Sequence, residues 1–127
     1  RIGDHAENIA DFAKSIIERE IFLDEDTVKE LDGIYELIKR GFALSIDALS
    51  TGDQEKVQQA IQIERDIDKL KIEVRDKYMK RMNKGIASAE SGIFVMDLLS
   101  NLERVSDHFR NIAETVERLK RPVIVTE

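Results

Sequence analysis

Four stretches of the chain repeat apolar residues at alternating spacings of three and four positions. Residues 1–22, 28–50, 54–82 and 89–120 carry this pattern, which is typical of a helix with one face packed against its neighbours. No comparable run alternates apolar and polar residues with the period of two that a strand needs. The sequence therefore predicts four long amphipathic helices, each of which needs other helices to cover its apolar face.

Short polar segments separate the predicted helices and contain residues that commonly end or begin a helix. Thr27 and Glu30 have the spacing of a capping box at the start of the second helix. Gly52 suits the left-handed position that follows a helix, and Gly85 ends the third helix in the same way. Ser88 is the expected N-cap of the fourth helix. These connections are short, which favours antiparallel neighbours.

The predicted fold is all-α, an antiparallel up-down bundle of four helices. We expect one domain, residues 1–120, because a chain of 127 residues matches the size of a single domain. Pro122 stops the fourth helix, so residues 121–127 form a short tail that we expect to be frayed.

One sequence motif occurs twice. Residues 1–11 and 104–114 are identical at six of eleven positions, which makes Asp4 the counterpart of Asp107. Helix geometry places Asp107 almost opposite the apolar face of its helix, with Glu103 beside it, so both carboxylates should point outward. Two interpretations are open: both copies kept an acidic outer face, or the carboxylates form a binding site.

Composition narrows the possible functions. The chain has a formal net charge of −6, which argues against binding to nucleic acid or a polybasic attachment to anionic lipid. It has no cysteine, so it forms neither a disulfide nor a thiolate metal site. No run is apolar and long enough for a membrane span, and we expect no signal peptide within this sequence. The chain begins with Arg1 inside the repeated motif, so we expect a further segment before it.

Acidic residues occur in pairs one helical turn apart. The pairs are Glu64 with Asp68 and Glu103 with Asp107, while Asp4 lacks the partner that would precede Arg1. Like charges at this spacing repel, so a cation between them is expected. Oxygen ligands suit magnesium, manganese or iron, and zinc would also recruit histidine. The alternative is neutralisation by basic neighbours, of which the nearest in sequence are Arg65, Lys69 and Arg104.

The two histidines and the remaining motifs do not indicate an enzyme. His108 lies on the flank of the apolar face, where a half-buried, hydrogen-bonded side chain is a simpler interpretation than a metal ligand. A carboxylate-bundle metalloenzyme needs Glu-x-x-His pairs, and neither His5 nor His108 has a glutamate three positions before it. The sequence also lacks a glycine-rich phosphate loop. We therefore expect no catalytic residues and no organic cofactor.

Three segments resemble the PhoU family. They are residues 1–10, 63–70 and 97–114, the last containing the Glu-Arg-x-x-Asp-His-x-x-Asn-Ile pattern, and the resemblance extends over residues 1–118. The order of these segments, together with residues 81–92, is most similar to the PhoU-like domain at the C-terminus of bacterial sodium/phosphate cotransporter proteins. The resemblance implies one three-helix repeat, preceded by the last helix of another repeat. It also implies metal clusters at Glu64, Asp68, Glu103, Asp107 and Asp4.

The resemblance implies a role in phosphate uptake or its regulation. The leading interpretation is a non-enzymatic regulatory domain of a sodium-dependent phosphate transporter, on the cytoplasmic side of the membrane, whose membrane domain lies upstream in the same chain. A free-standing cytoplasmic regulator is the alternative, and a carboxylate metalloenzyme is a third interpretation from another class. We also expect that the first helix either folds onto the other three or exchanges with a second chain to form a homodimer.

Overall fold

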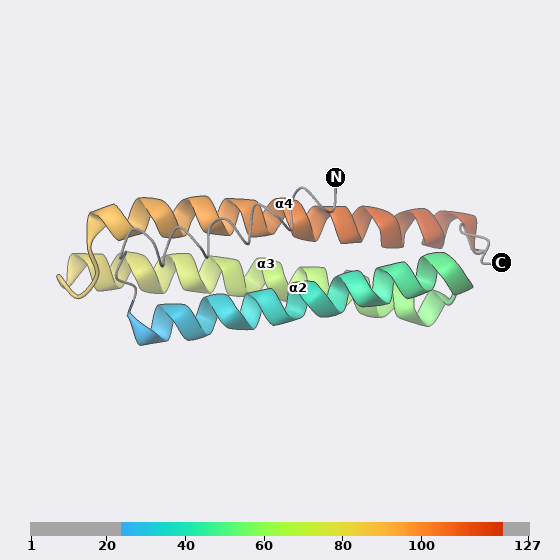
Figure 1. Cartoon of the computed structure of the whole chain (residues 1–127), viewed down its shortest axis with the longest axis horizontal. Coiled ribbons are helices and arrows are strands. Elements are labelled where there is room, and N and C mark those ends of the chain that lie inside the picture. The colour runs from blue at the N-terminus through green and yellow to red at the C-terminus, as the bar shows by residue number, and fades with distance from the viewer. Residues whose placement is uncertain (1–23, 121–127) are drawn as a thin grey trace.

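The computed structural model describes residues 24–120, which form three long α-helices (Figure 1). Helix α2 spans Glu25–Thr51, α3 spans Gln54–Asn83 and α4 spans Ala89–Leu119. Each helix packs against both others, and consecutive helices run in opposite directions along one elongated bundle. The described residues contain no strand. The predictions of an all-helical fold and of antiparallel neighbours are confirmed for this part of the chain.

The predicted number of helices is not supported. Residues 24–120 form three helices rather than four. The helix expected over residues 1–22 and the tail expected over residues 121–127 both lie outside the described residues.

Helix α2 begins three residues earlier than the sequence predicted, and Thr27 is not its cap. Asp24 has the extended backbone of an N-cap, and its carboxylate accepts hydrogen bonds from the backbone nitrogen and hydroxyl of Thr27, at 3.1 and 2.6 Å. Thr27 is buried, and its hydroxyl also accepts a hydrogen bond from Arg81 of α3. Asp24 rather than Thr27 is the N-cap, because a carboxylate is a strong acceptor for the free backbone N–H groups of the first helical turn.

The other predicted helix boundaries are confirmed. Gly52 has a φ of 75° and donates its backbone N–H to the carbonyl of Ala48, which closes α2. The side chain of Asp53 then caps α3 by accepting from two backbone nitrogens. Gly85, with a φ of 76°, lies in the turn after α3, and Ser88 caps α4. These local signals fix where the bundle turns.

The core is a continuous apolar layer between the three helices. It contains the aliphatic residues Leu31, Ile34, Ile38, Val57, Ile61, Ile63, Ile67, Val74, Val95, Leu98, Leu99, Leu102, Val105 and Val116, together with alanines and the aromatic rings of Tyr78 and Phe109. Burial of this surface is the main force that holds the helices together. The core therefore supports the long α3–α4 pair that carries most of the candidate site residues.

Phe109 of α4 determines how closely α2 and α4 approach. Its ring is fully buried over Gly41, where a Cβ atom would lie 2.4 Å from the nearest ring carbon. Phe42 meets the same ring edge-on, with 5.5 Å between centroids. The Ser45 hydroxyl donates a hydrogen bond of 3.0 Å to the Phe109 carbonyl. Only glycine at position 41 lets this ring lie against the backbone of α2.

Candidate carboxylate site on α3 and α4

Glu64 of α3 is a carboxylate inside the bundle. It is only 2 % exposed, although it is one of the predicted metal ligands. Its Oε2 accepts a hydrogen bond of 2.9 Å from Nη1 of Arg110 on α4, and the two side chains form an ion pair. Arg110 also lies 3.6 Å from the carboxylate of Glu114, one turn further along α4. The arginine therefore links a buried acid to a surface acid.

Burial and neighbouring acids raise the pKa of Glu64 above its ordinary value of 4.5. Loss of hydration is the largest cause, because an ionised carboxylate is poorly stabilised away from water. Asp68 adds to the effect through a hydrogen bond and its charge, and Asp107 adds a smaller repulsion. The positive charge of Arg110 acts in the opposite direction. Three of the predicted acids thus influence one another across the α3–α4 pair.

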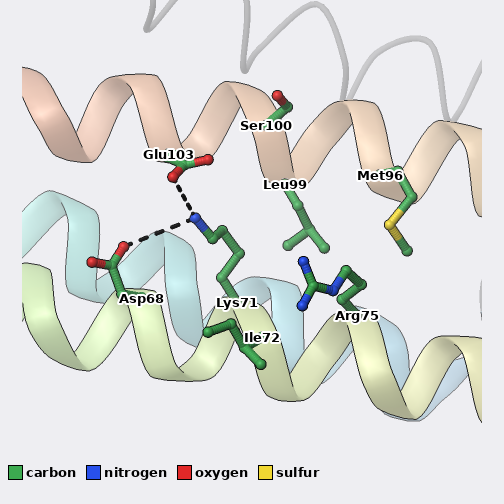
Figure 2. A pocket seen from close by; sticks show the side chains of 8 residues that line it. All are labelled: Asp68, Lys71, Ile72, Arg75, Met96, Leu99, Ser100 and Glu103. Atoms are coloured by element: carbon green, nitrogen blue, oxygen red, sulfur yellow. Dashed lines mark ion pairs between the residues drawn. The ribbon is translucent and has the colours of Figure 1, made fainter.

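Lys71 connects Asp68 on α3 with Glu103 on α4. Its Nζ lies 2.7 Å from Oε1 of Glu103 on α4 and 3.9 Å from Oδ1 of Asp68 on its own helix. Figure 2 shows the lysine pointing between the two carboxylates at the edge of a groove between α3 and α4. We call it the α3–α4 groove; it has a volume of about 500 Å³ and is lined by Asp68, Lys71, Ile72, Arg75, Met96, Leu99, Ser100 and Glu103. The groove therefore has acidic, basic and apolar side chains in its lining.

The predicted outward orientation of Glu103 and Asp107 on α4 is confirmed, whereas Glu64 on α3 lies inside the bundle. Glu103 and Asp107 are exposed, as the helix geometry predicted. Glu64 faces inward because it lies one position after Ile63 and three before Ile67, within the buried side of α3. Asp68 is half-buried at the edge of the groove. Asp4 and His5 lie outside the described residues, and His108 is half-buried as expected.

The described acids do not form a metal centre by themselves. Among residues 24–120, no group of three or more carboxylate or imidazole side chains is arranged to hold a metal ion. The ionic interactions of Glu64, Asp68 and Glu103 go instead to Arg110 and Lys71. Asp4, which the metal prediction includes, is not among these residues. Metal binding by the full set of five acids therefore stays a prediction.

The two basic residues of the site were missed at the sequence level. The nearest basic neighbours were expected to be Arg65, Lys69 and Arg104, but the structure uses Lys71 and Arg110. Arg110 lies three residues after Asp107, a spacing that places it on a neighbouring side of the same helix. That spacing was visible in the sequence, but the contact with Glu64 depends on how α3 and α4 are aligned.

The chain matches the model of a known protein family. The family model described as the PhoU domain matches residues 31–116, which is more than half of the chain and includes most of each described helix. The chain belongs to the PhoU family. The Glu64–Arg110 and Lys71–Glu103 contacts both lie within the matched PhoU domain.

A curated PhoU relative gives a functional context. The chain is similar to the phosphate-specific transport system accessory protein PhoU homolog 1 of Thermotoga maritima, with 28 % identity over 126 residues. The match covers 91 % of this chain but 52 % of the relative, so the chain spans about half the length of that protein. A search of solved structures found no significant match.

None of α2, α3 and α4 contains an apolar stretch long enough to cross a bilayer. The outward orientation of Glu103 and Asp107 also disfavours the carboxylate-metalloenzyme interpretation, which requires acids that converge inside the bundle.

Proposed function

We propose that this chain is a non-enzymatic accessory domain that regulates phosphate transport. The observation that carries the proposal is the match of the PhoU domain to residues 31–116, which lie within one packed three-helix bundle. The name of the Thermotoga maritima relative, an accessory protein of a phosphate-specific transport system, supports the same role. In this role the domain acts by contact with a transport protein, and its charged α3–α4 surface is available for that contact.

Two arrangements of this function are consistent with these observations. The resemblance of residues 81–92 to the cotransporter subgroup supports a domain attached to a sodium-dependent phosphate transporter. The relative's name supports a free-standing accessory protein. The two differ in where the natural protein is found in the cell, on the cytoplasmic side of the membrane or free in the cytoplasm.

Cell fractionation separates the two arrangements. An antibody against residues 24–120 is used to blot soluble and membrane fractions after an alkaline carbonate wash. A covalently attached domain stays in the washed membrane fraction and migrates as a much larger protein. A free-standing regulator appears in the soluble fraction near its own mass. Co-purification from detergent extracts then tests the shared claim, because the tagged chain should enrich a phosphate-transport protein. If no phosphate-transport protein is enriched, the result contradicts the accessory role.

We also propose that the acidic residues take up a metal ion, as the family resemblance implies. The supporting observation is that Asp68 and Asp107 lie close enough to Glu64 to raise its pKa. In the described arrangement Arg110 and Lys71 balance these acids, so a metal ion has to compete with both. Candidate ions are iron, manganese, magnesium and zinc, and their preference for oxygen ligands is the basis of the choice.

Thermal unfolding with and without metal tests this proposal. Addition of Mn²⁺ or Fe²⁺ to the EDTA-treated chain should raise its melting temperature, because a ligand that binds only the folded state stabilises it. The double variant Glu103→Ala, Asp107→Ala should lose this increase. The variant Glu25→Ala, Glu36→Ala, which removes two exposed acids of α2, is the matched control and should keep it. Identical melting curves with and without metal would retire the proposal.

A further inference from the structure

Helix α2 has apolar side chains exposed along one flank. Val28, Tyr35 and Ile46 are 49 %, 40 % and 47 % exposed. They are seven and eleven residues apart, which is close to whole numbers of helical turns, so the three side chains share one flank. Phe42 continues the same row seven residues after Tyr35. Exposed apolar side chains that line up in this way indicate a contact surface more strongly than the same side chains scattered singly.

This flank of α2 is the one beside α4. Phe42 meets the ring of Phe109 on α4 edge-on. The opposite flank of α2 faces α3, where Glu30 forms ion pairs with Lys77 and Arg81. The exposed apolar row therefore borders α4, whereas the flank toward α3 carries charged contacts.

Contacts with Phe109 fix the alignment of α2 and α4. The two helices run in the same direction, with α3 antiparallel to both (Figure 1). Ser45 donates its hydroxyl to the carbonyl of Phe109, 64 residues later, and Gly41 lies under the ring of Phe109, 68 residues later. A residue of α2 is therefore level with the residue of α4 about 66 positions later, midway between these two values.

This alignment gives α4 a matching apolar row. Phe94 is level with Val28, and Ile112 is level with Ile46. Both α4 residues are half-buried. Glu103, nine residues after Phe94 and so half a turn further round the helix, contacts α3, which places Phe94 on the flank toward α2. We call the combined surface the α2–α4 face; it consists of Val28, Tyr35, Phe42, Ile46, Phe94 and Ile112.

The length and position of residues 1–22 suit this face. These residues lie outside the described part of the chain, and only Leu23 separates them from Asp24, the N-cap of α2. A helix with so short a connection runs antiparallel to α2 and directly beside it. A helix of 22 residues is about 33 Å long, and the 18 residues from Val28 to Ile46 extend over about 27 Å. The segment is therefore long enough to cover the whole face.

The sequence of this segment has a narrow apolar row. Ile2, Ile9 and Ile16 follow one another at steps of seven, and Ala6 and Ala13 lie between them. Small alanine side chains allow a helix to approach its neighbours closely. An isolated amphipathic helix is only marginally stable in water, so this row needs an apolar surface. Of the two flanks of α2 that the segment can reach, the α2–α4 face is the apolar one.

We propose that residues 1–22 pack as a helix on the α2–α4 face of the same chain, antiparallel to α2 and α4. The short connection brings Phe22 level with Asp26 in the first turn of α2. Twenty residues further along both helices, Ile2 is then level with Ile46. By the same count, Ala13 is level with Tyr35.

This arrangement completes a bundle of four helices. Each of them is antiparallel to the helices beside it, and α3 lies diagonally opposite residues 1–22. The segment covers apolar side chains of α2 and α4 at once and leaves the α3–α4 groove on the other side of α4.

Cysteine cross-linking tests the contact, because the natural chain has no cysteine. The double variant Ala13→Cys, Tyr35→Cys is treated with a short bismaleimide at low protein concentration. It should form a link within one chain, seen as a faster-migrating band of monomer mass. The matched control is Ala13→Cys, Ile72→Cys. Ile72 is 47 % exposed and lies in the α3–α4 groove, so this pair should not be linked.

Hydrogen exchange of the whole chain gives a second readout. Peptides from residues 1–22 should exchange slowly in the wild type, because a packed helix is protected. Ile46→Asp places a charge in the α2–α4 face and should speed their exchange by about tenfold or more. Ile72→Asp, at an equally exposed isoleucine of α3, should leave their exchange unchanged. Circular dichroism confirms that each variant is folded.

Four results overturn the proposal. The first is a link to position 72 instead of position 35, and the second is no link to position 35 at all. A link that forms only between two chains shows that a second copy covers the face. Residues 1–22 that exchange as fast in the wild type as in Ile46→Asp show that the α2–α4 face does not hold them.

Discussion

Glu64 is the buried acid of the candidate site, and its charge has to be balanced inside the bundle. A carboxylate that is 2 % exposed is stable in the folded protein only if a cation or a proton balances its charge. Arg110 supplies the cation, but its own side chain is 38 % exposed, so water weakens their attraction. Burial and the nearby acids then shift the balance toward the protonated form. The site is therefore sensitive to both pH and the loss of Arg110.

The raised pKa of Glu64 predicts how stability changes with pH. Between 4.5, the ordinary value for the unfolded chain, and the higher pKa of the folded chain, the folded state holds a proton that the unfolded state has released. The free energy of unfolding therefore falls as pH rises through this window. Glu64→Gln should remove the decline and raise stability at neutral pH. Urea unfolding over a pH series measures this.

Glu73→Gln, at an exposed acid of the same helix, is the control for the pH experiment. This variant should keep the wild-type decline above pH 4.5. A Glu64→Gln protein that shows the same decline as the wild type would contradict the assignment to Glu64.

Arg110→Ala should have the opposite effect at neutral pH. It leaves the buried Glu64 carboxylate without its counter-charge and should lower the free energy of unfolding by about 1–3 kcal/mol. The loss should shrink in acid, where Glu64 is protonated and needs no partner. Combining Arg110→Ala with Glu64→Gln should recover part of the stability in urea unfolding. A loss that is equal at acid and neutral pH would show that the arginine acts through packing alone.

In the packing between helices, the closest approach involves Gly41 of α2 and the ring of Phe109 on α4. A methyl group there would lie 2.4 to 2.8 Å from three carbons of the Phe109 ring, which is fully buried and cannot move freely. Gly41→Ala should therefore lower stability by about 1–3 kcal/mol, the usual effect of overpacking. Gly33→Ala is the matched control on the same helix, because a Cβ at position 33 meets nothing within 4 Å.

Gly33→Ala should instead raise stability by about 0.5–1 kcal/mol, through the better helix propensity of alanine. Thermal and urea unfolding of the two variants are compared in one experiment. Equal effects at positions 33 and 41 would contradict the close approach of α2 and α4 at Phe109.

The sequence predicted individual helices better than their contacts. Spacing and cap residues located the ends of α3 and α4 closely, because these signals are local to each helix. They missed the start of α2, where Asp24 competes with Thr27 for the same role. Tyr35 follows Leu31 at the four-residue spacing that favours burial, but it is 40 % exposed, with Lys39 above its ring. The buried row passes instead through Ile34 and Ile38, because two neighbouring helices together decide which side is covered.

For the molecule as a whole, the sequence indicated how the acids of α4 are oriented but not what the predicted acids contact. The spacing of Glu103 and Asp107 was sufficient to predict an outward orientation. The contacts of Glu64 with Arg110 and of Lys71 with Glu103 depend on the alignment of α3 and α4, which no local pattern encodes. The family could be predicted from the motifs, since the PhoU match covers the residues that carry two of the three.

Phosphate uptake by intact cells tests the central claim most directly. Uptake of radiolabelled phosphate is measured over a range of external phosphate in cells with the intact gene, with the coding sequence for residues 31–116 removed in frame, and with the gene restored. An accessory domain that regulates transport predicts that removal changes how uptake responds to external phosphate and that restoration returns the original response. Uptake curves that coincide in all three strains, with the transporter present at equal levels, would contradict the proposed function.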